Sequence, residues 1–145
     1  MAFKFSLATV LRLREIAEDR EERLLMQIRQ QMAQSHHELA ELDARCIALI
    51  AQRESELTNQ IPAASVQGSY MQISVLEARK KGVREHLIAL EALRVQQLKV
   101  YEKAHQNREV IEQIRKEKLE VFQREQVRRE QHDMDDNFAA RRARR

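Results

Sequence analysis

The sequence has very few residues of the kinds that bend a chain or cross-link it. It contains one proline (Pro62), two glycines, one cysteine and no tryptophan, and aromatic residues make up 4% of it. Strands and tight turns depend on glycine and proline, whereas long helices exclude both. A single cysteine cannot form an internal disulfide, which favours a reducing cytosol. These scarcities argue for a helical protein without covalent cross-links.

Long apolar runs are also missing. No window approaches the roughly 18 uninterrupted apolar residues of a membrane-spanning helix. The N-terminal stretch FKFSLATVLRLRE is apolar only briefly, because Ser6, Thr9 and Arg12 interrupt it, and no small-residue cleavage site follows. We therefore interpret this stretch as the first turns of a helix and not as a signal peptide.

Charge of both signs is what the sequence has in abundance. Charged residues make up 34% of the chain, yet the net charge is only +3. Such a balance indicates a solvated surface and not a nucleic-acid-binding one. Apolar residues recur at regular intervals over most of the length, which excludes disorder and is typical of a coiled coil.

The first predicted helix covers residues 5–60. Ser6 is a candidate N-cap, with Phe5 and Val10 placed as a hydrophobic staple. The apolar stripe fades over residues 17–23, which predicts loose packing there. Further along, Leu39, Leu42, Cys46 and Leu49 are spaced 3, 4 and 3 apart, which keeps one edge facing a partner helix.

A turn is predicted over residues 61–69, because this stretch holds the proline and Gly68, which permits a left-handed conformation. Ser69 and Gln72 match a capping box, so the second helix is predicted over 70–137 and a basic tail over 138–145. The apolar spacing drifts between Leu90 and Leu98, which predicts a stutter. Folding about residue 65 would place residue i opposite about 130 − i. The expected fold is all-α: one domain, residues 1–145, with two long helices in an antiparallel coiled-coil hairpin.

The side chains suited to catalysis do not form a recognisable site. Glu102 and His105 have the Glu-x-x-His spacing of di-iron bundles, but those need a second such motif. His36 and His37 diverge by about 100° around a helix, so they cannot share a metal. A two-helix structure offers no concave pocket. We expect no enzyme activity, metal, cofactor or small-molecule substrate.

Two patches are candidates for contact with other proteins. The apolar residues Tyr70, Met71, Ile73, Val75 and Leu76 cover more than one helix face, so some must be exposed; they either bind a partner or pack against the turn. The basic C-terminal end either docks on an acidic surface or is simply solvated. Nucleic acid is not an expected partner, because aromatic side chains on which bases could stack are lacking.

Three segments resemble the FliJ family of flagellar export proteins. The N-terminal F-x-F-x-L-x-x-V-L-R-L-R-E (Phe3 to Glu15) is similar to the opening of that family. The segment YMQISVLEARKKGVREHL (70–87) resembles the stretch after its hairpin turn, and RREQHDMDDNFAARRARR (128–145) resembles its C-terminal end.

The resemblance implies a cytoplasmic protein, peripheral on the inner membrane, in the flagellar type III export apparatus. Its implied role is a stalk between the hexameric export ATPase and the membrane export gate, with export chaperones as further partners. The residues implied for gate contact are Leu76, Glu77, Tyr70 and Ile73. Those implied for contact with the ATPase ring are Leu7, Leu11, Arg12, Arg14, Arg124, Arg128 and Arg129. The basic Arg79 and Lys80 suggest that the gate-facing patch is more basic here than elsewhere in the family.

Two alternatives stay open at this point. One is the equivalent stalk of a virulence type III secretion system. The other is a generic coiled-coil scaffold that homodimerises into a four-helix bundle.

Overall fold

The computed structural model describes residues 2–59 and 62–144, and over these residues it contains helix and no strand. The two helices are α1 (Ala8–Thr58) and α2 (Ala63–Ala143). The chain divides into two compact units, which we describe separately. The turn unit is residues 21–100; the terminal unit combines residues 1–20 with 101–145. The predicted all-α class with two long packed helices is confirmed.

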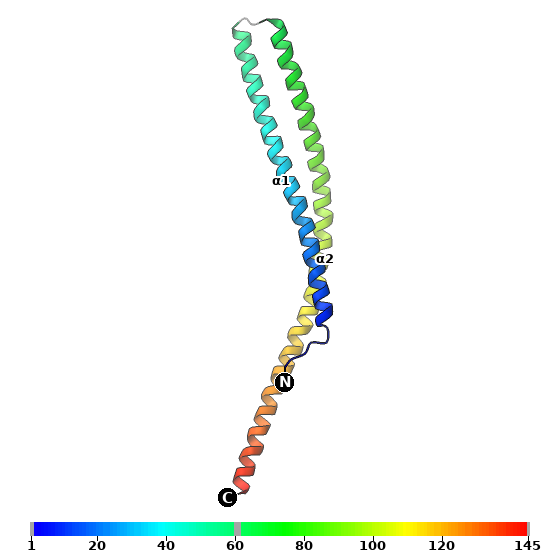
Figure 1. Cartoon of the computed structure of the whole chain (residues 1–145), viewed down its shortest axis with the longest axis vertical. Coiled ribbons are helices and arrows are strands. Elements are labelled where there is room, and N and C mark those ends of the chain that lie inside the picture. Colours follow the sequence, from blue (N-terminus) through cyan, green and yellow to red (C-terminus); the bar gives the residue numbers. More distant parts are fainter. Residues whose placement is uncertain (1, 60–61, 145) are drawn as a thin grey trace. The chain divides into compact units, whose positions relative to one another are not determined.

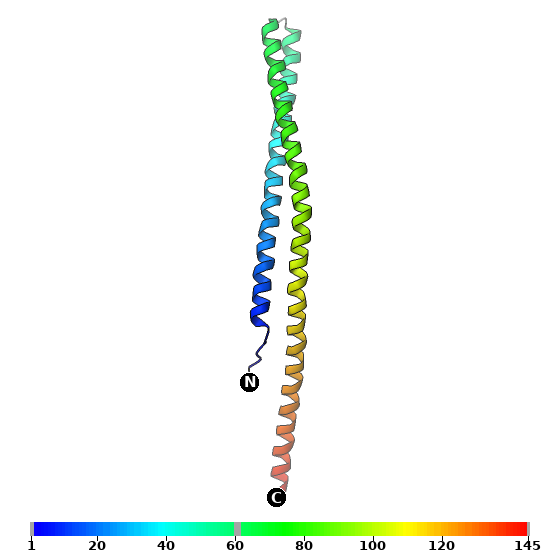
Figure 2. The same ribbon diagram turned by 90° about the vertical axis from the view of Figure 1, so that its right-hand side faces the viewer.

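In the turn unit, α1 and α2 run antiparallel and side by side on either side of the turn (Figures 1 and 2). Side chains pair across them: Arg79 with Glu38 at 2.6 Å, and Lys80 with Asp43 at 2.6 Å. At the far end of the unit, the amide nitrogen of Gln97 donates to the Glu21 carboxylate at 2.6 Å. These pairs establish the hairpin.

The contact between the helices, which we call the seam, follows a heptad spacing of alternating 3 and 4 residues. On α1 it is formed by buried and half-buried residues at Glu21, Leu25, Ile28, Met32, Ser35, Leu39, Leu42, Cys46, Leu49, Arg53 and Glu56. On α2 it is formed by Val66, Ser69, Ile73, Leu76, Lys80, Val83, Leu87, Leu90, Arg94 and Gln97. The most deeply buried apolar members, Leu25, Cys46 and Leu90, are each 3% exposed.

Polar residues hold several seam positions, and this corrects the predicted stutter. Between Leu90 and Leu98, the half-buried Arg94 and Gln97 continue the 4, 3 spacing without a break. The prediction was wrong because only apolar residues had been counted. Glu21, within the stretch where the apolar stripe fades, is likewise a seam residue, bonded to Gln97.

The turn is shorter than predicted. α2 begins at Ala63 and not at residue 70. Pro62 directly precedes it, a position where its missing N–H costs nothing, and the Ser65 amide donates to the Pro62 carbonyl at 3.0 Å. Gly68 lies within α2 without a left-handed conformation, and the Ser69 hydroxyl donates to the Ser65 carbonyl instead of capping a helix. Residue 60, the predicted end of the first helix, and residue 61, the first residue of the predicted turn, lie outside the described residues.

The earlier start of α2 also shifts the predicted register. Residues that pair across the turn unit, such as Glu38 with Arg79 and Asp43 with Lys80, have numbers that add up to about 120 and not 130. Leu42 therefore lies at the level of Lys80 and not of Leu87 to Leu90. The shift is about three turns of helix.

Both outer ends of the helices also differ from prediction. The first i+4 bond of α1 runs from the Leu11 amide to the Leu7 carbonyl at 2.9 Å, so the helix starts just after Ser6 and Leu7. Residues 138–143, predicted as a tail, continue α2, whose last turn carries Arg141 and Arg142. Cations are favourable there because the carbonyl end of a helix is negative.

Candidate partner-binding surfaces

In the turn unit, an apolar groove opens between α1 and α2 near the turn. It has a volume of about 390 Å³ and is lined by Leu49, Met71, Gln72, Val75 and Leu76. Met71 and Val75 are 67% and 68% exposed. The prediction that part of the apolar cluster at 70–76 is exposed is therefore confirmed.

The four residues predicted for gate contact differ in accessibility. Tyr70 is exposed, and the guanidinium of Arg53 lies 4.3 Å above its ring centre, a cation–π contact. Ile73 and Leu76 are half-buried seam residues, and of these two Leu76 lines the groove. Met71 and Val75 offer more apolar surface than either.

The basic residues of the predicted gate-facing patch, Arg79 and Lys80, are both paired with carboxylates. Lys80 is buried, with its ammonium 2.6 Å from Asp43 and 3.2 Å from Glu77, and hydrogen bonds to these two carboxylates raise its pKa. Arg79 is paired with Glu38. The positive charges of Arg79 and Lys80 are thus matched by acidic side chains. Glu77, predicted for gate contact, already has Lys80 as a partner within the chain.

In the terminal unit, the N-terminal aromatic residues pack onto α2. The rings of Phe3 and Phe122 lie 5.6 Å apart, and the Lys118 ammonium lies 5.9 Å from the centre of the Phe5 ring. Lys118 also donates to the Ser6 hydroxyl at 3.4 Å. The Phe-x-Phe motif therefore anchors the N-terminal segment, a packing role that the sequence analysis missed because it lies outside the heptad pattern.

The residues predicted to contact the ATPase ring fall into two groups. Leu7 is half-buried and Leu11 is 6% exposed, so both face the helix pair. The arginines are exposed: Arg12, Arg14, Arg124, Arg128 and Arg129.

Two shallow surface sites of the terminal unit involve these arginines. One, of about 430 Å³, is lined by the N-terminal phenylalanines together with Leu11, Arg12, Glu15 and Arg115. The other, of about 380 Å³, lies along α2 at Val127, flanked by Arg124 and Arg128. Both combine an apolar floor with guanidinium groups, which suits contact with an acidic protein surface.

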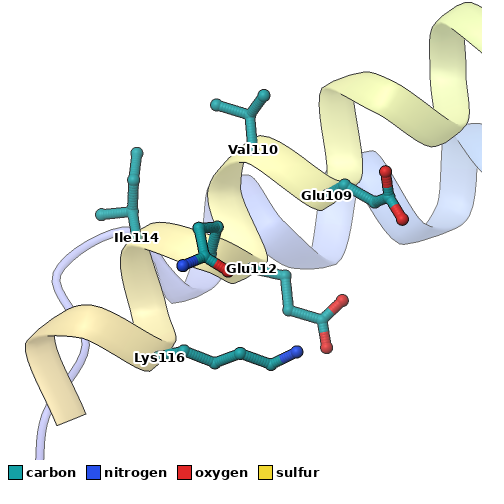
Figure 3. A pocket seen from close by; sticks show the side chains of 6 residues that line it. Glu109, Val110, Glu112, Ile114 and Lys116 are labelled. Carbon is teal, nitrogen blue, oxygen red and sulfur yellow. The ribbon is translucent and has the colours of Figure 1, made fainter. Parts of the chain in front are cut away.

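A further depression, of about 540 Å³, is lined by Glu109, Val110, Glu112, Gln113, Ile114 and Lys116. All six belong to neighbouring turns of α2, and Figure 3 shows Val110 and Ile114 pointing to one side with Glu112 and Lys116 on another. Such an open surface has no walls with which to exclude water from a reaction.

Over residues 2–59 and 62–144, no group of three or more histidine, cysteine, aspartate or glutamate side chains is arranged to hold a metal ion. Over the same ranges, neither helix contains a stretch long and apolar enough to span a bilayer.

Comparison with known proteins identifies the family. The family model described as flagellar FliJ protein matches residues 3–145, essentially the whole chain. Neither the curated proteins nor the solved structures contain a match. The chain therefore belongs to the FliJ family, whose members are non-enzymatic components associated with flagellar protein export.

Proposed function

We propose that this chain is a coiled-coil stalk that links the hexameric export ATPase to the membrane export gate during flagellum assembly. It would act in the cytoplasm, peripheral on the inner membrane, and would also bind export chaperones. The observation that carries the proposal is the family match over residues 3–145. The match also favours the flagellar system over a virulence secretion system.

The proposed ATPase-binding surface is the basic part of the terminal unit. Beyond Gln126, every described residue of α2 is exposed, so this segment has its whole circumference available to a partner. Arg124, Arg128 and Arg129, with Arg12 and Arg14 on α1, would meet acidic side chains. Exposed charges of this kind speed association while allowing the partners to separate. Leu7 and Leu11 would support this surface from inside the helix pair.

A pull-down with the flagellar export ATPase tests this surface. Changing Arg124, Arg128 and Arg129 together to Glu should reduce capture about tenfold or more, because three attractive charges become repulsive. The matched control changes the exposed Arg29, Lys81 and Arg84 of the turn unit to Glu, with the same change in net charge. Equal capture of both variants would contradict the assignment.

The proposed gate-binding surface is the apolar groove with Tyr70, Ile73, Leu76 and Glu77 around it. Val75→Asp places a charge on the groove without disturbing the seam, since Val75 is 68% exposed. Loss of binding to the cytoplasmic part of the gate protein is expected, with Leu76→Asp and Glu77→Lys as further variants. Ile88→Asp is the control, because Ile88 is an equally exposed apolar residue on the same helix. Binding that survives Val75→Asp and Leu76→Asp would rule this surface out.

The alternative of a homodimeric scaffold is tested by hydrodynamic mass. The exposed apolar residues, Ile47, Met71, Val75 and Ile88 among them, are the surface on which a second copy would pack. A stable dimer at low micromolar concentration would favour the scaffold over the stalk.

A further inference from the structure

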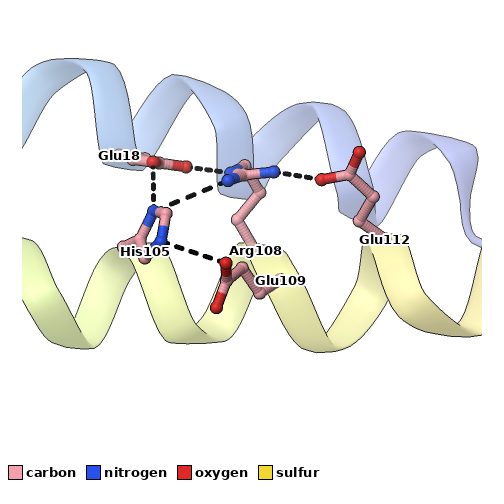
Figure 4. A network of polar contacts seen from close by, with 5 residues as sticks. All are labelled: Glu18, His105, Arg108, Glu109 and Glu112. Atoms are coloured by element: carbon pink, nitrogen blue, oxygen red, sulfur yellow. Dashed lines mark hydrogen bonds and ion pairs between the residues drawn. The ribbon is translucent and has the colours of Figure 1, made fainter.

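A cluster of five charged or titratable side chains joins α1 to α2 within the terminal unit, and the proposed contact surfaces use none of them. We call it the Glu18 cluster: Glu18 on α1, with His105, Arg108, Glu109 and Glu112 on α2 (Figure 4). The Glu18 side chain is only 13% exposed, and it accepts hydrogen bonds from both His105 and Arg108. Arg108 also pairs with Glu112.

His105 is held between two carboxylates, one at each ring nitrogen. Its Nδ1 lies 2.7 Å from Glu18 Oε1 on α1, and its Nε2 lies 3.1 Å from Glu109 Oε1 on α2 (Figure 4). A neutral imidazole carries one N–H, whereas the imidazolium carries two. Only the protonated ring can donate to both carboxylates. Loss of the proton leaves a nitrogen lone pair facing a negative oxygen.

The charges around His105 favour its protonated form on balance. Glu18 faces it from α1, Glu109 faces it from α2, and the Arg108 guanidinium opposes them at 3.5 Å from Nδ1. The hydrogen bond to Glu18 raises the pKa of His105, desolvation lowers it, and the Glu109 carboxylate raises it again, so the net direction is upward. Burial raises the pKa of Glu18, but the bonds from His105 and Arg108 lower it by more.

Few other contacts hold this part of α1. Of residues 8–20, only Leu11 and Glu18 are not exposed. Glu18 therefore fixes the end of this segment farther from the N-terminus, and Leu11 and the N-terminal phenylalanines fix the end nearer to it.

We propose that the Glu18 cluster is a proton-controlled clasp, in which protonated His105 holds the first turns of α1 against α2 and its deprotonation loosens them. Arg108 keeps its bond to Glu18 at all relevant pH values, so the loosening is partial. Opening would uncover the inward face of α1 around Glu18. The clasp would operate whether or not the chain acts as a stalk.

The pH range in which the clasp stays closed follows from the pKa shifts of His105 and Glu18. Because the pKa of His105 is raised in the closed form, its contribution is complete below the ordinary histidine value of 6.5 and is lost as pH rises through the raised value. Because the pKa of Glu18 is lowered from 4.5, its contribution is lost only as pH falls through that lowered value. The clasp is therefore tightest between these limits and loosens on the alkaline side.

The test measures the distance between the helices in the full-length chain. Spin labels at Ile16→Cys and Val110→Cys, in a Cys46→Ala background, sit on side chains that are 56% and 59% exposed. Raising the pH from about 6 to about 9 should broaden the distance distribution, with a midpoint at the His105 pKa measured by NMR. By linkage, the closed-to-open ratio should fall tenfold for each unit by which the closed-form pKa exceeds the open-form value.

Variants separate the clasp from general effects of pH. His105→Gln should give the broad distribution at both pH values, and His105→Arg, which keeps its charge, should give the narrow one at both. His132→Gln is the matched control, because His132 pairs at 3.0 Å with Asp136 on its own helix. It should behave like the wild type. A pH-independent wild-type distance, a His105 pKa no higher than the ordinary histidine value of 6.5, or full pH response in His105→Gln would overturn the proposal.

Discussion

The two units hold the same pair of helices together by different means. In the turn unit, the seam is closed by apolar side chains from both helices, among them Leu25, Leu42, Val83 and Leu90. In the terminal unit, Leu11, which is 6% exposed, is the one described residue that is buried, and half-buried apolar residues such as Ile111 and Ile114, aromatic contacts and the Glu18 cluster contribute the rest. Apolar burial depends little on pH or salt, whereas charged contacts near the surface depend on both. The terminal unit is thus the more readily opened of the two.

The largest expected effect comes from shortening an apolar seam residue. Leu90→Ala removes a side chain that is 3% exposed and should lower the free energy of unfolding by about 2–4 kcal/mol. Ile47→Ala, at a side chain that is 68% exposed, is the control and should have little effect. Thermal or urea unfolding measures both. A similar loss in the two variants would mean that the seam does not dominate the turn unit.

A smaller and more local effect is expected from the N-terminal aromatic anchor. Phe3→Ala removes the contact with Phe122 and should cost roughly 1 kcal/mol, confined to the terminal unit. Hydrogen exchange should speed up over residues 7–20 and stay unchanged over residues 25–55. Phe138→Ala, at a side chain that is 70% exposed, should leave both regions unchanged. Faster exchange throughout the turn unit would show that the two units do not open independently.

The smallest effect is expected at Gly82, in the middle of the α2 part of the turn unit. A Cβ atom built there meets nothing within 4 Å, so alanine fits without a clash. Gly82→Ala should raise the free energy of unfolding by about 0.5–1 kcal/mol, because alanine favours the helix. Gly68→Ala, close to the start of α2, should give less. Destabilisation by Gly82→Ala would instead contradict the open surroundings of this position.

Sequence reasoning reached the fold because the heptad spacing and Pro62 are unambiguous signals. It placed the start of α2 too late because Gly68 and Ser69 resemble turn residues, yet both lie inside a helix whose first turn Pro62 already accommodates. Because the turn lies earlier in the chain than predicted, the register between the two helices shifts as well. The predicted pairs of facing residues were therefore wrong.

The candidate sites were harder to predict than the fold. Glu21, Lys80, Arg94 and Gln97 occupy seam positions, where an apolar pattern cannot find them. The same is true of Glu18, whose contact with His105 joins residues far apart in the sequence. Leu11, Ile73 and Leu76 were placed on the correct helices, but the side on which each lies depends on the partner helix. Whether each of these residues lies in the seam or at the surface is decided by pairing across the two helices, which a single sequence does not display.

The exposure of α2 beyond Gln126 bears on how this part of the chain meets another protein. A helical stretch without packing against another helix is held by its backbone bonds and by local pairs such as that of His132 with Asp136, and it is marginal in water. It should fray and re-form freely when the chain is by itself. A partner that surrounds it would supply the missing packing, so capture and ordering would happen in one step, at a cost in affinity that favours repeated release.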